Sequence, residues 1–452
     1  MISPLDSRVL DANSESLGIE VDVLMANAGE ALADVITDMF SGKKILFVCG
    51  TGNNGGDGYV AARLLDADVA FFKEPKTAPA MNAFHKIENR PIQFDEKMLD
   101  DYDVIIDCVL GTGVSGDVRE PYASYIGSVN GCGKTVVSCD VPSGFGTSVC
   151  IRPDVTVTFH DIKEGMDEEN CGTIIVADIG IPDDAYKYIG TGDMLRYPVP
   201  DKNAHKGQNG RLLIIGGGPY TGAPSLAGMA ALRVGVDLVH IATPESSFQT
   251  VAAASPSYIV HRLPGDRLDV SSVNYLIEMS RNMDAVLIGP GLGSDEETRK
   301  AIIEFVEACD IPMVVDADGV TSFRGDIPKK NIIFTPHRGE YEKLARGAVP
   351  EEFANKNSCI VVLKGPTDTI TDGARTRLNR TGTPAMTVGG TGDVLAGTIA
   401  GLLAKGMSPF DAGCLGTYIC GRAGEMAFGE FSYGLLATDV IDNIARVLSQ
   451  EL

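Results

Sequence analysis

Three segments in the first half of the chain combine glycines with oxygen-bearing side chains, each directly after a run of apolar residues. They are GTGNNGGDG at 50–58, DCVLGTGVSGD at 107–117 and SCDVPSG at 138–144. Glycines leave the backbone N–H groups of a turn open to an anion, and a helix that begins there adds its positive end. Carboxylate, amide and hydroxyl oxygens can bind a hard cation or move protons. The pattern predicts a site for an anionic ligand with acid/base chemistry.

The first of these segments also fits the GxGxxG pattern, which is as often an ordinary strand-to-helix turn as a dinucleotide site. A structural turn needs only the glycines, whereas Asn53, Asn54 and Asp57 add three oxygen-bearing side chains. A dehydrogenase would use GxGxxG with an acidic residue such as Glu74 after the next strand, but NNGGD fits that pattern poorly. In the third segment, Asp140 could simply cap a helix and Ser143 could simply fill a turn, without a functional role.

A fourth segment, GGTGD at 389–393, precedes a run of small apolar residues in the second half. Its glycine amides and the helix start predict a phosphate site, with Asp393 in the first helical turn. An acidic residue at that place could simply complement the helix dipole. The alternative is a general base that takes a proton from the group to be phosphorylated.

The strands and helices that must position these residues follow the pattern of an α/β protein. Val- and Ile-rich runs alternate with glycine-rich turns and helical patterns, which predicts parallel strands buried on both faces. The expected strands are 45–49, 103–107, 135–140, 155–160 and 173–180, then 211–218, 238–243, 284–293, 313–319, 331–337 and 359–365, with helices after Gly392 and Phe410. In open α/β sheets, ligands bind beyond the carboxyl ends of strands, where the four segments would lie.

A Pro-, Gly- and Asn-rich stretch at 197–210 predicts a linker, so we expect domains at 1–197 and 198–452. Lys and Arg total 38 against 61 Asp and Glu, a net charge of −23, which argues against nucleic acid or an anionic membrane as a partner. Ten cysteines without a CxxC pair indicate reduced thiols, and no apolar stretch predicts a membrane span. These features predict a cytoplasmic protein.

NNGGDG, DCVLGTG and CDVPSG, in this order, resemble the NAD(P)H-hydrate epimerase family over most of residues 20–180. The resemblance implies a Rossmann-like doubly wound sheet and a potassium ion held by Asn54, Asp107 and Ser143. It implies acid/base chemistry by Asp140. The substrate contacts that it implies are Asn53, Asn54, Gly55, Gly56, Asp57, Gly111, Thr112, Gly113, Val114, Ser115, Gly116, Asp117, Tyr122 and Asp140.

HKGQNG, GGGPYTGAPSLAG, GPGLG, VVDADG, TPHRGE and GTGD resemble the ADP-dependent NAD(P)H-hydrate dehydratases, which are ribokinase-like, over nearly all of residues 205–405. The resemblance implies that Asp393 is the general base and that Glu340 organises magnesium. This sequence departs from the family pattern at two positions. Arg338 stands where the family usually has Pro, and Gly389 stands where it usually has Ala. The implied substrate contacts are Ala223, Gly291, His337 and Asp393, and the implied nucleotide contacts are Lys364, Gly365, Pro366, Thr367, Asp368 and Gly392.

Together, the two resemblances imply a bifunctional enzyme that repairs hydrated NADH and NADPH. One half would epimerise the R and S hydrates with K⁺, and the other would dehydrate the S form with Mg²⁺ and ADP, giving AMP and phosphate. A homo-oligomer is compatible with this reading. The rivals are a ribokinase-type small-molecule kinase, which would release a stable phosphoester, and a nucleotide-binding scaffold without turnover, against which Asp140 and Asp393 argue.

Overall fold

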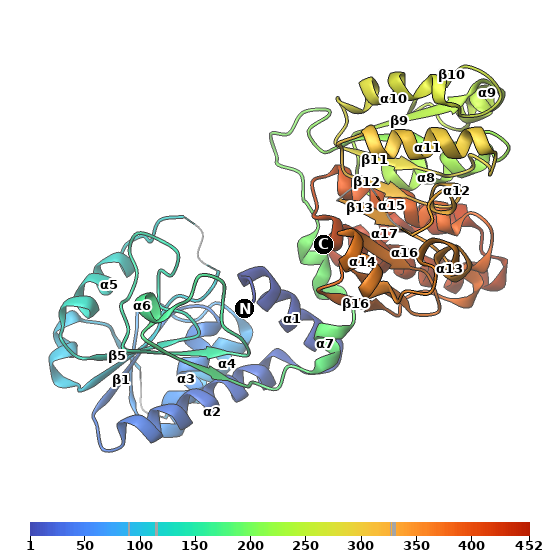
Figure 1. Cartoon of the computed structure of the whole chain (residues 1–452). Coiled ribbons are helices and arrows are strands. Elements are labelled where there is room, and N and C mark those ends of the chain that lie inside the picture. The colour runs from blue at the N-terminus through green and yellow to red at the C-terminus, as the bar shows by residue number, and fades with distance from the viewer. Residues whose placement is uncertain (89–90, 114–115, 326, 328–330) are drawn as a thin grey trace. The chain divides into compact units, whose positions relative to one another are not determined.

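The computed structural model describes residues 1–88, 91–113, 116–325, 327 and 331–452, and the chain divides into two compact units, Met1–Ala185 and Tyr186–Leu452 (Figure 1). The sequence placed the domain boundary between 197 and 198, and that boundary stays a prediction. Ile189, Met194 and Tyr197, which lie before it, pack into the hydrophobic core of the second unit.

The first unit is built on a parallel sheet with strand order β3-β2-β1-β4-β5-β6-β7. The strands are β1 (Ile45–Cys49), β2 (Asp68–Phe71), β3 (Ile92–Gln93), β4 (Val104–Cys108), β5 (Thr135–Cys139), β6 (Val155–Phe159) and β7 (Thr173–Ala177). The five strands expected from the sequence are present, whereas β2 and β3 were not predicted. Because β1, β4 and β5 are parallel neighbours, the three polar segments that follow them lie at one edge of the sheet.

Helices cover both faces of this sheet. The helical elements of this unit are α1 (Pro4–Ser16), α2 (Val21–Phe40), α3 (Asn53–Leu65), α4 (Ala78–His85), η1 (Glu96–Asp101), α5 (Tyr122–Gly131) and α6 (Glu168–Cys171), and α7 (Asp183–Lys187) contains the boundary between the two units. Residues of α2, α3 and α4, such as Leu32 and Tyr59, pack with Phe47 and Ile106 on one face. Tyr125 and Ile126 of α5 pack on the opposite face. The doubly wound arrangement follows from strands that are apolar on both sides.

The second unit is also α/β, with strand order β10-β9-β8-β11-β12-β13-β14-β15-β16. The strands are β8 (Arg211–Ile215), β9 (Leu238–Pro244), β10 (Tyr258–Leu263), β11 (Ala285–Ile288), β12 (Met313–Val315), β13 (Ile332–Phe334), β14 (Ile360–Leu363), β15 (Asp368–Thr371) and β16 (Thr376–Asn379). Pairing is parallel from β10 to β14 and antiparallel for β15 and β16. The six strands expected here are present, and β10, β15 and β16 were not predicted.

Two hydrophobic clusters sandwich this second sheet. The helical elements are η2 (Thr191–Arg196), α8 (Gly222–Arg233), α9 (Glu245–Ala254), η3 (Val270–Ser272), α10 (Val273–Ser280), α11 (Glu296–Ala308), α12 (Asp318–Thr321), α13 (Arg338–Ala345), α14 (Pro350–Asn357), η4 (Pro384–Thr387), α15 (Thr391–Ala404), α16 (Pro409–Phe431), η5 (Ser432–Gly434) and α17 (Ala437–Glu451). Helices α8, α15, α16 and α17 pack on one face and α10, α11, α13 and α14 on the other. The predicted helices after Gly392 and Phe410 are α15 and α16.

Two further predictions concern the thiols and the membrane. All ten cysteines are free, as predicted, and most are buried. Among the residues that the structure describes, none of the helices combines the length and the apolar character that a membrane crossing requires.

Candidate functional site

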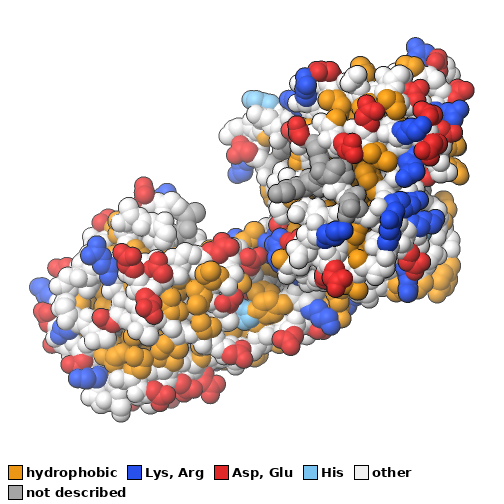
Figure 2. Space-filling model, viewed as in Figure 1, with side chains coloured by type: hydrophobic (Ala, Val, Ile, Leu, Met, Phe, Trp, Pro, Cys, Tyr) orange, Lys and Arg blue, Asp and Glu red, His pale blue; other side chains and the backbone are white. Residues whose placement is uncertain are grey.

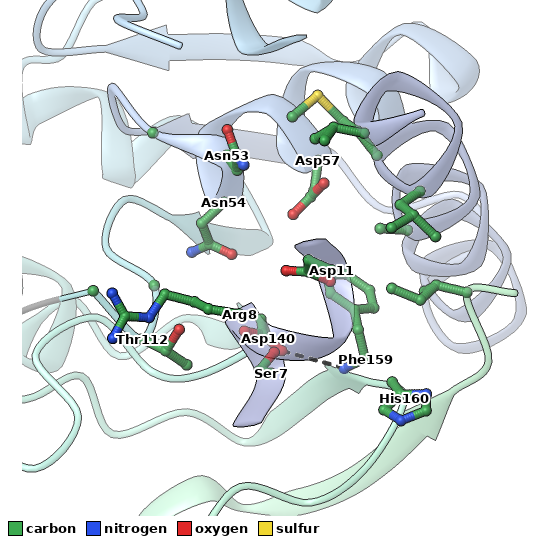
Figure 3. A pocket seen from close by; sticks show the side chains of 18 of the residues that line it. Ser7, Arg8, Asp11, Asn53, Asn54, Asp57, Thr112, Asp140, Phe159 and His160 are labelled. Carbon is green, nitrogen blue, oxygen red and sulfur yellow. Dashed lines mark hydrogen bonds between the residues drawn. The ribbon is translucent and has the colours of Figure 1, made fainter. Parts of the chain in front are cut away.

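A cavity of about 430 Å³ opens at the edge of the first sheet where β1, β4 and β5 end (Figure 3). It brings together seven residues that the sequence assigned to a site. They are Asn53, Asn54, Asp57, Gly111, Thr112, Gly113 and Asp140. The asparagines and Asp57 come from the first turns of α3, so the glycine-rich turn presents both a helix start and oxygen atoms to the cavity.

Other predicted contacts lie outside the lining of this cavity. A Cβ atom on Gly55 would lie 2.3 Å from the carbonyl oxygen of Gly50, and one on Gly56 would lie 2.4 Å from the Met25 side chain. Both glycines therefore permit close packing of α3. Tyr122 begins α5, where its ring packs against Phe72. Gly116 and Asp117 lie in the loop before α5, and Val114 and Ser115 lie outside the described residues.

The fully buried carboxylate of Asp107, which is not among the residues lining the cavity, lies near the end of β4 within hydrogen-bonding reach of three side chains and the main chain. Ser143 donates to it twice, from its hydroxyl at 2.6 Å and from its backbone N–H at 2.8 Å. The hydroxyls of Ser138 and Tyr125 donate at 3.1 Å and 3.2 Å. Burial raises the pKa of Asp107, and these hydrogen bonds oppose the rise. The arrangement holds the predicted cation ligands Asp107 and Ser143 together.

The third predicted cation ligand, Asn54, is 9% exposed, and within the described chain neither its Oδ1 nor its Nδ2 has a hydrogen-bond partner. A buried polar atom without a partner is costly, so such an amide indicates a missing ligand. In the same ranges no three His, Cys, Asp or Glu side chains gather as a metal site. A hard cation held by amide, hydroxyl and carboxylate oxygens fits this donor set better than a transition metal.

The sequence interpretation missed four charged or ionisable residues of the cavity: Arg8, Asp11, His160 and Lys163. Lys163 is 1% exposed and forms an ion pair with Asp140. Its ammonium group also donates to the Thr158 hydroxyl at 3.0 Å and to the Phe159 carbonyl at 2.7 Å. His160 and Lys163 follow β6, the neighbour of β5, so the rule that ligands bind at strand ends could have pointed to them.

Carboxyl groups in this cavity are crowded around a single buried ammonium group. Burial and then the charge of Asp140 raise the pKa of Asp11 to about 6, and Lys163 opposes the rise. Burial, Asp140 and Asp11 raise the pKa of Asp57 well above its ordinary value. The cavity therefore places two carboxyl groups that favour their protonated form, Asp11 and Asp57, near Asp140, which pairs with Lys163. Such a set of groups is suited to general acid/base catalysis.

The second unit has a cavity of about 690 Å³ beside the start of α15. The sequence-predicted residues His337, Lys364, Gly365, Pro366, Asp368 and Gly392 line it, and the predicted Thr367 does not. Gly390, directly before α15, has φ of +96°, a conformation that glycine adopts without strain. The turn leaves the amide groups at the helix start near the Lys364 ammonium, which lies 3.4 Å from a Cβ position on Gly392.

Asp393 lies in the first turn of α15, as predicted, within a group of charged residues. Burial, then the charges of Asp316 and Asp318, raise its pKa to about 7, although Lys364 lowers it. Lys364 in turn pairs with Asp316 at 3.0 Å. Burial opposes a charged Lys364, but the attraction of Asp316 and Glu340 raises its pKa. A carboxyl with a pKa near neutrality is suited to remove a proton at neutral pH.

The remaining predicted contacts lie at neighbouring strand ends. His337 caps α13, because its Nδ1 accepts from the backbone N–H of Gly339 at 3.0 Å while Glu340 accepts from the His337 N–H at 2.9 Å. Ala223 and Gly291 follow β8 and β11, and a Cβ on Gly291 would lie 3.3 Å from that of Ala223. These two residues are adjacent to each other but do not line the 690 Å³ cavity.

Comparisons with known proteins agree with both halves of the chain. Residues 21–165 match the family model described as the YjeF-related protein N-terminus, and residues 212–446 match the NAD(P)H-hydrate dehydratase model. The bifunctional NAD(P)H-hydrate repair enzyme of Archaeoglobus fulgidus is 36% identical over 99% of this chain and 98% of its own. That of Methanocaldococcus jannaschii is 38% identical over 99% and 94%. The Bacillus subtilis ADP/ATP-dependent NAD(P)H-hydrate dehydratase, crystallised with ATP and Mg²⁺, has a TM-score of 0.53 at 27% identity over 59% of this chain and 99% of its own.

Proposed function

Because the chain belongs to the family of bifunctional NAD(P)H-hydrate repair enzymes, we propose that its first unit interconverts the R and S hydrates of NADH and NADPH and its second unit restores NAD(P)H from the S hydrate. The second unit uses ADP as phosphoryl donor and releases AMP and phosphate. The observation that carries the proposal is Asp393, a carboxyl with a pKa of about 7 at a glycine-rich helix start. The curated relatives support the repair function rather than the ribokinase-type kinase that the GTGD turn also allowed.

In the first unit, the reacting carbon of the hydrate bears a hydroxyl group beside the ring nitrogen. Inverting it requires a proton to leave the hydroxyl and a proton to reach the nitrogen. Asp140 faces the cavity and accepts the hydroxyl proton, while Lys163 stabilises the carboxylate from the buried side. The turns at Asn53 and Gly111 hold the substrate by their backbone amides.

In the second unit, water leaves the hydrated ring poorly, whereas a phosphate ester leaves easily. Asp393 deprotonates the hydroxyl, the nucleotide phosphorylates it, and phosphate is then eliminated. The loop from Lys364 to Asp368 and the amide groups at Gly392 bind the nucleotide. Glu340 would help to hold Mg²⁺, which would supply positive charge to the nucleotide phosphates.

In the first unit, Asn54, Asp107 and Ser143 would hold K⁺. The support is the unpartnered Asn54 amide together with the buried Asp107–Ser143 pair. The ion would supply a fixed positive charge near the anionic substrate.

We expect potassium to support epimerisation better than sodium, because the larger ion matches a site built from several neutral and charged oxygens. Asp107→Ala should weaken this dependence and leave dehydration unchanged. The measurement is the rate of R-to-S conversion in matched KCl and NaCl series, with dehydration of pure S hydrate as the control. Equal rates in both salts would contradict the cation site, and loss of both activities in Asp107→Ala would mean that the units do not act independently.

A second expectation concerns pH. Asp393 acts as a base only when deprotonated, so the kcat/KM for dehydration should rise with pH through about 7. Initial rates with saturating nucleotide between pH 5.5 and 9 would show this limb, at roughly one decade per pH unit below the pKa. A flat profile over this range would exclude a base with the environment of Asp393.

The overall proposal is tested by incubating the protein with mixed R and S hydrates and ADP or ATP while following the absorbance of reduced nicotinamide. Complete recovery requires both activities, whereas recovery of the S fraction alone would reveal only the dehydratase. A stable phosphoester as product would indicate a kinase.

The net charge of −23, with acidic side chains over both units in Figure 2, supports small anionic metabolites held by local amide groups and argues against nucleic acid and membranes as partners. A cytoplasmic location and a homo-oligomer are further parts of this proposal.

A further inference from the structure

Helix α1 places two charged side chains in the cavity of the first unit, although the recognised sequence segments begin after it. Arg8 and Asp11 are three residues apart, so they share one face of the helix. Figure 3 shows the side chains of Asp11, Asp57, Asn54 and Asp140 gathered around the same cavity. In the same cavity, the Asn54 amide has no hydrogen-bond partner within the described chain, which points to a polar ligand that would supply one.

Two backbone hydrogen bonds tie the start of α1 to the segment that carries Lys163. The N–H of Ile2 donates to the Ile162 carbonyl and the N–H of Glu164 donates to the Ile2 carbonyl, both at 2.9 Å. At the other end of the helix, the Asn13 side chain donates to the Ala185 carbonyl at 3.3 Å. The position of Asp11 relative to Lys163 is therefore fixed by hydrogen bonds at both ends of α1.

The charges around Asp11 are unevenly balanced. Lys163 directs its ammonium group to Asp140, to a hydroxyl and to a carbonyl. Within the described residues, Asp11 itself has neither a hydrogen bond nor an ion pair. The groups that face it are Asp57 from α3, Asp140 after β5, His160 and Lys163 after β6, and Arg8 on its own helix. A half-buried carboxyl near two others and without a partner favours its protonated form.

We propose that Asp11 is the second acid/base residue of the epimerisation and works opposite Asp140; this rests on the function proposed above. In ring opening, the Asp140 carboxylate accepts the hydroxyl proton, the oxygen's electron pair forms a C=O bond, and the carbon–nitrogen bond breaks. Asp11 gives its proton to the departing nitrogen. Closure on the opposite face of the carbonyl returns the nitrogen proton to Asp11 and the Asp140 proton to the oxygen, so no net proton is consumed.

Two features of the cavity support this division of work. The pKa of Asp11, raised to about 6 by burial and by Asp140, keeps part of the residue protonated near neutral pH. The buried ammonium group of Lys163 pairs with Asp140, whereas Asp11 has no ion pair within the described residues. Pairs of carboxyl groups whose environments differ in this way divide into an acid and a base.

The test is Asp11→Asn in the full-length protein, with Glu15→Gln as the matched control, since Glu15 is exposed on the same helix. We expect R-to-S conversion to fall by roughly 100-fold or more in Asp11→Asn, as for loss of a general acid, and to stay unchanged in Glu15→Gln. Dehydration of pure S hydrate should be unchanged in both. Asp11→Glu should recover part of the rate.

The pH profile separates a catalytic role from a structural one. Wild-type epimerisation should fall as pH rises through the pKa of Asp11, about 6, because the acid form is lost, and Asp11→Asn should lack that limb. A wild-type profile without this limb, or an Asp11→Asn variant at the wild-type rate, would overturn the inference while leaving the proposed function intact. Absence of epimerisation in the wild-type protein would instead overturn the proposed function.

Discussion

Replacing Asp393 with asparagine is expected to slow dehydration by roughly 100- to 10,000-fold, the usual cost of losing a general base. Asparagine keeps the shape and a polar contact at the start of α15 but removes the basic oxygen. Nucleotide affinity should be maintained, because the amide groups at Gly392 and the loop at Lys364 are unchanged. The S hydrate should accumulate while R and S still interconvert, since the first unit needs no nucleotide.

A matched variant distinguishes catalysis from a simple helix-dipole effect. Glu296 lies in the first turn of α11, as Asp393 lies in the first turn of α15, but it is exposed and does not line the 690 Å³ cavity. Glu296→Gln therefore removes the same kind of dipole interaction, worth typically 0.3 to ~1 kcal/mol, outside the site. Its dehydration rate should match that of the wild type. If Asp393→Asn also dehydrated at the wild-type rate, Asp393 would be excluded as the base, and a water molecule held by Glu340 or His337 would be the next candidate.

Asp393→Asn should also raise the stability of the second unit at pH values above about 7. The folded-state pKa of Asp393, about 7, lies above the ordinary aspartate pKa of 3.8, so the contribution of Asp393 to stability is present at low pH and is lost as pH rises to about 7. Above pH 7 the wild-type protein pays to keep this carboxylate buried. Asp393→Asn should therefore unfold at a higher temperature than the wild type at pH 8, and the advantage should disappear near pH 4. Such a gain from removing a catalytic group is the expected trade-off between stability and activity.

The sequence predicted those parts of the fold that depend on local pattern. Buried parallel strands are apolar throughout, so β1, β4 and β5 and their polar ends could be located, and adjacency in the sheet then gathers Asn54, Asp107 and Asp140. The short edge strand β3 and the antiparallel pair β15 and β16 carry weaker patterns. Their place depends on contacts made by the folded chain, which the local sequence does not encode.

The cavity residues that were missed share one property, which is that they lie outside the glycine-rich turns. Arg8 and Asp11 belong to helix α1, which was not predicted from the sequence, although Ser3 and Asp6 form a capping box at its start. Nothing local to that helix indicates that it docks beside the end of β6. Likewise, Lys163 looks like a surface lysine until the fold buries it against Asp140. Long-range packing, not propensity, makes these residues part of the site.

Asp140→Asn is expected to reduce epimerisation by roughly 100- to 10,000-fold and, unlike the change at Asp393, to destabilise the first unit. It leaves the Lys163 ammonium, 1% exposed, without its carboxylate partner, and breaking a buried pair in this way costs about 3 kcal/mol. The positive charge of Lys163 also favours the ionised forms of Asp11 and Asp57. Ionisation of either group would partly compensate the unpaired ammonium group and reduce the loss of stability.

The double variant Asp140→Asn with Lys163→Met separates the two effects. Methionine has a similar length and removes the buried charge, so most of the lost stability should return, although Thr158 and the Phe159 carbonyl lose a donor. Epimerisation should stay at the level of the single variant, because the base is still absent. Chemical denaturation and R-to-S conversion are measured on the wild type, on Asp140→Asn and on the double variant. Together they separate the effect on stability from the effect on catalysis. If epimerisation recovered together with stability, Asp140 would be a structural partner of Lys163, and the proton would have to be taken by Asp11 or Asp57.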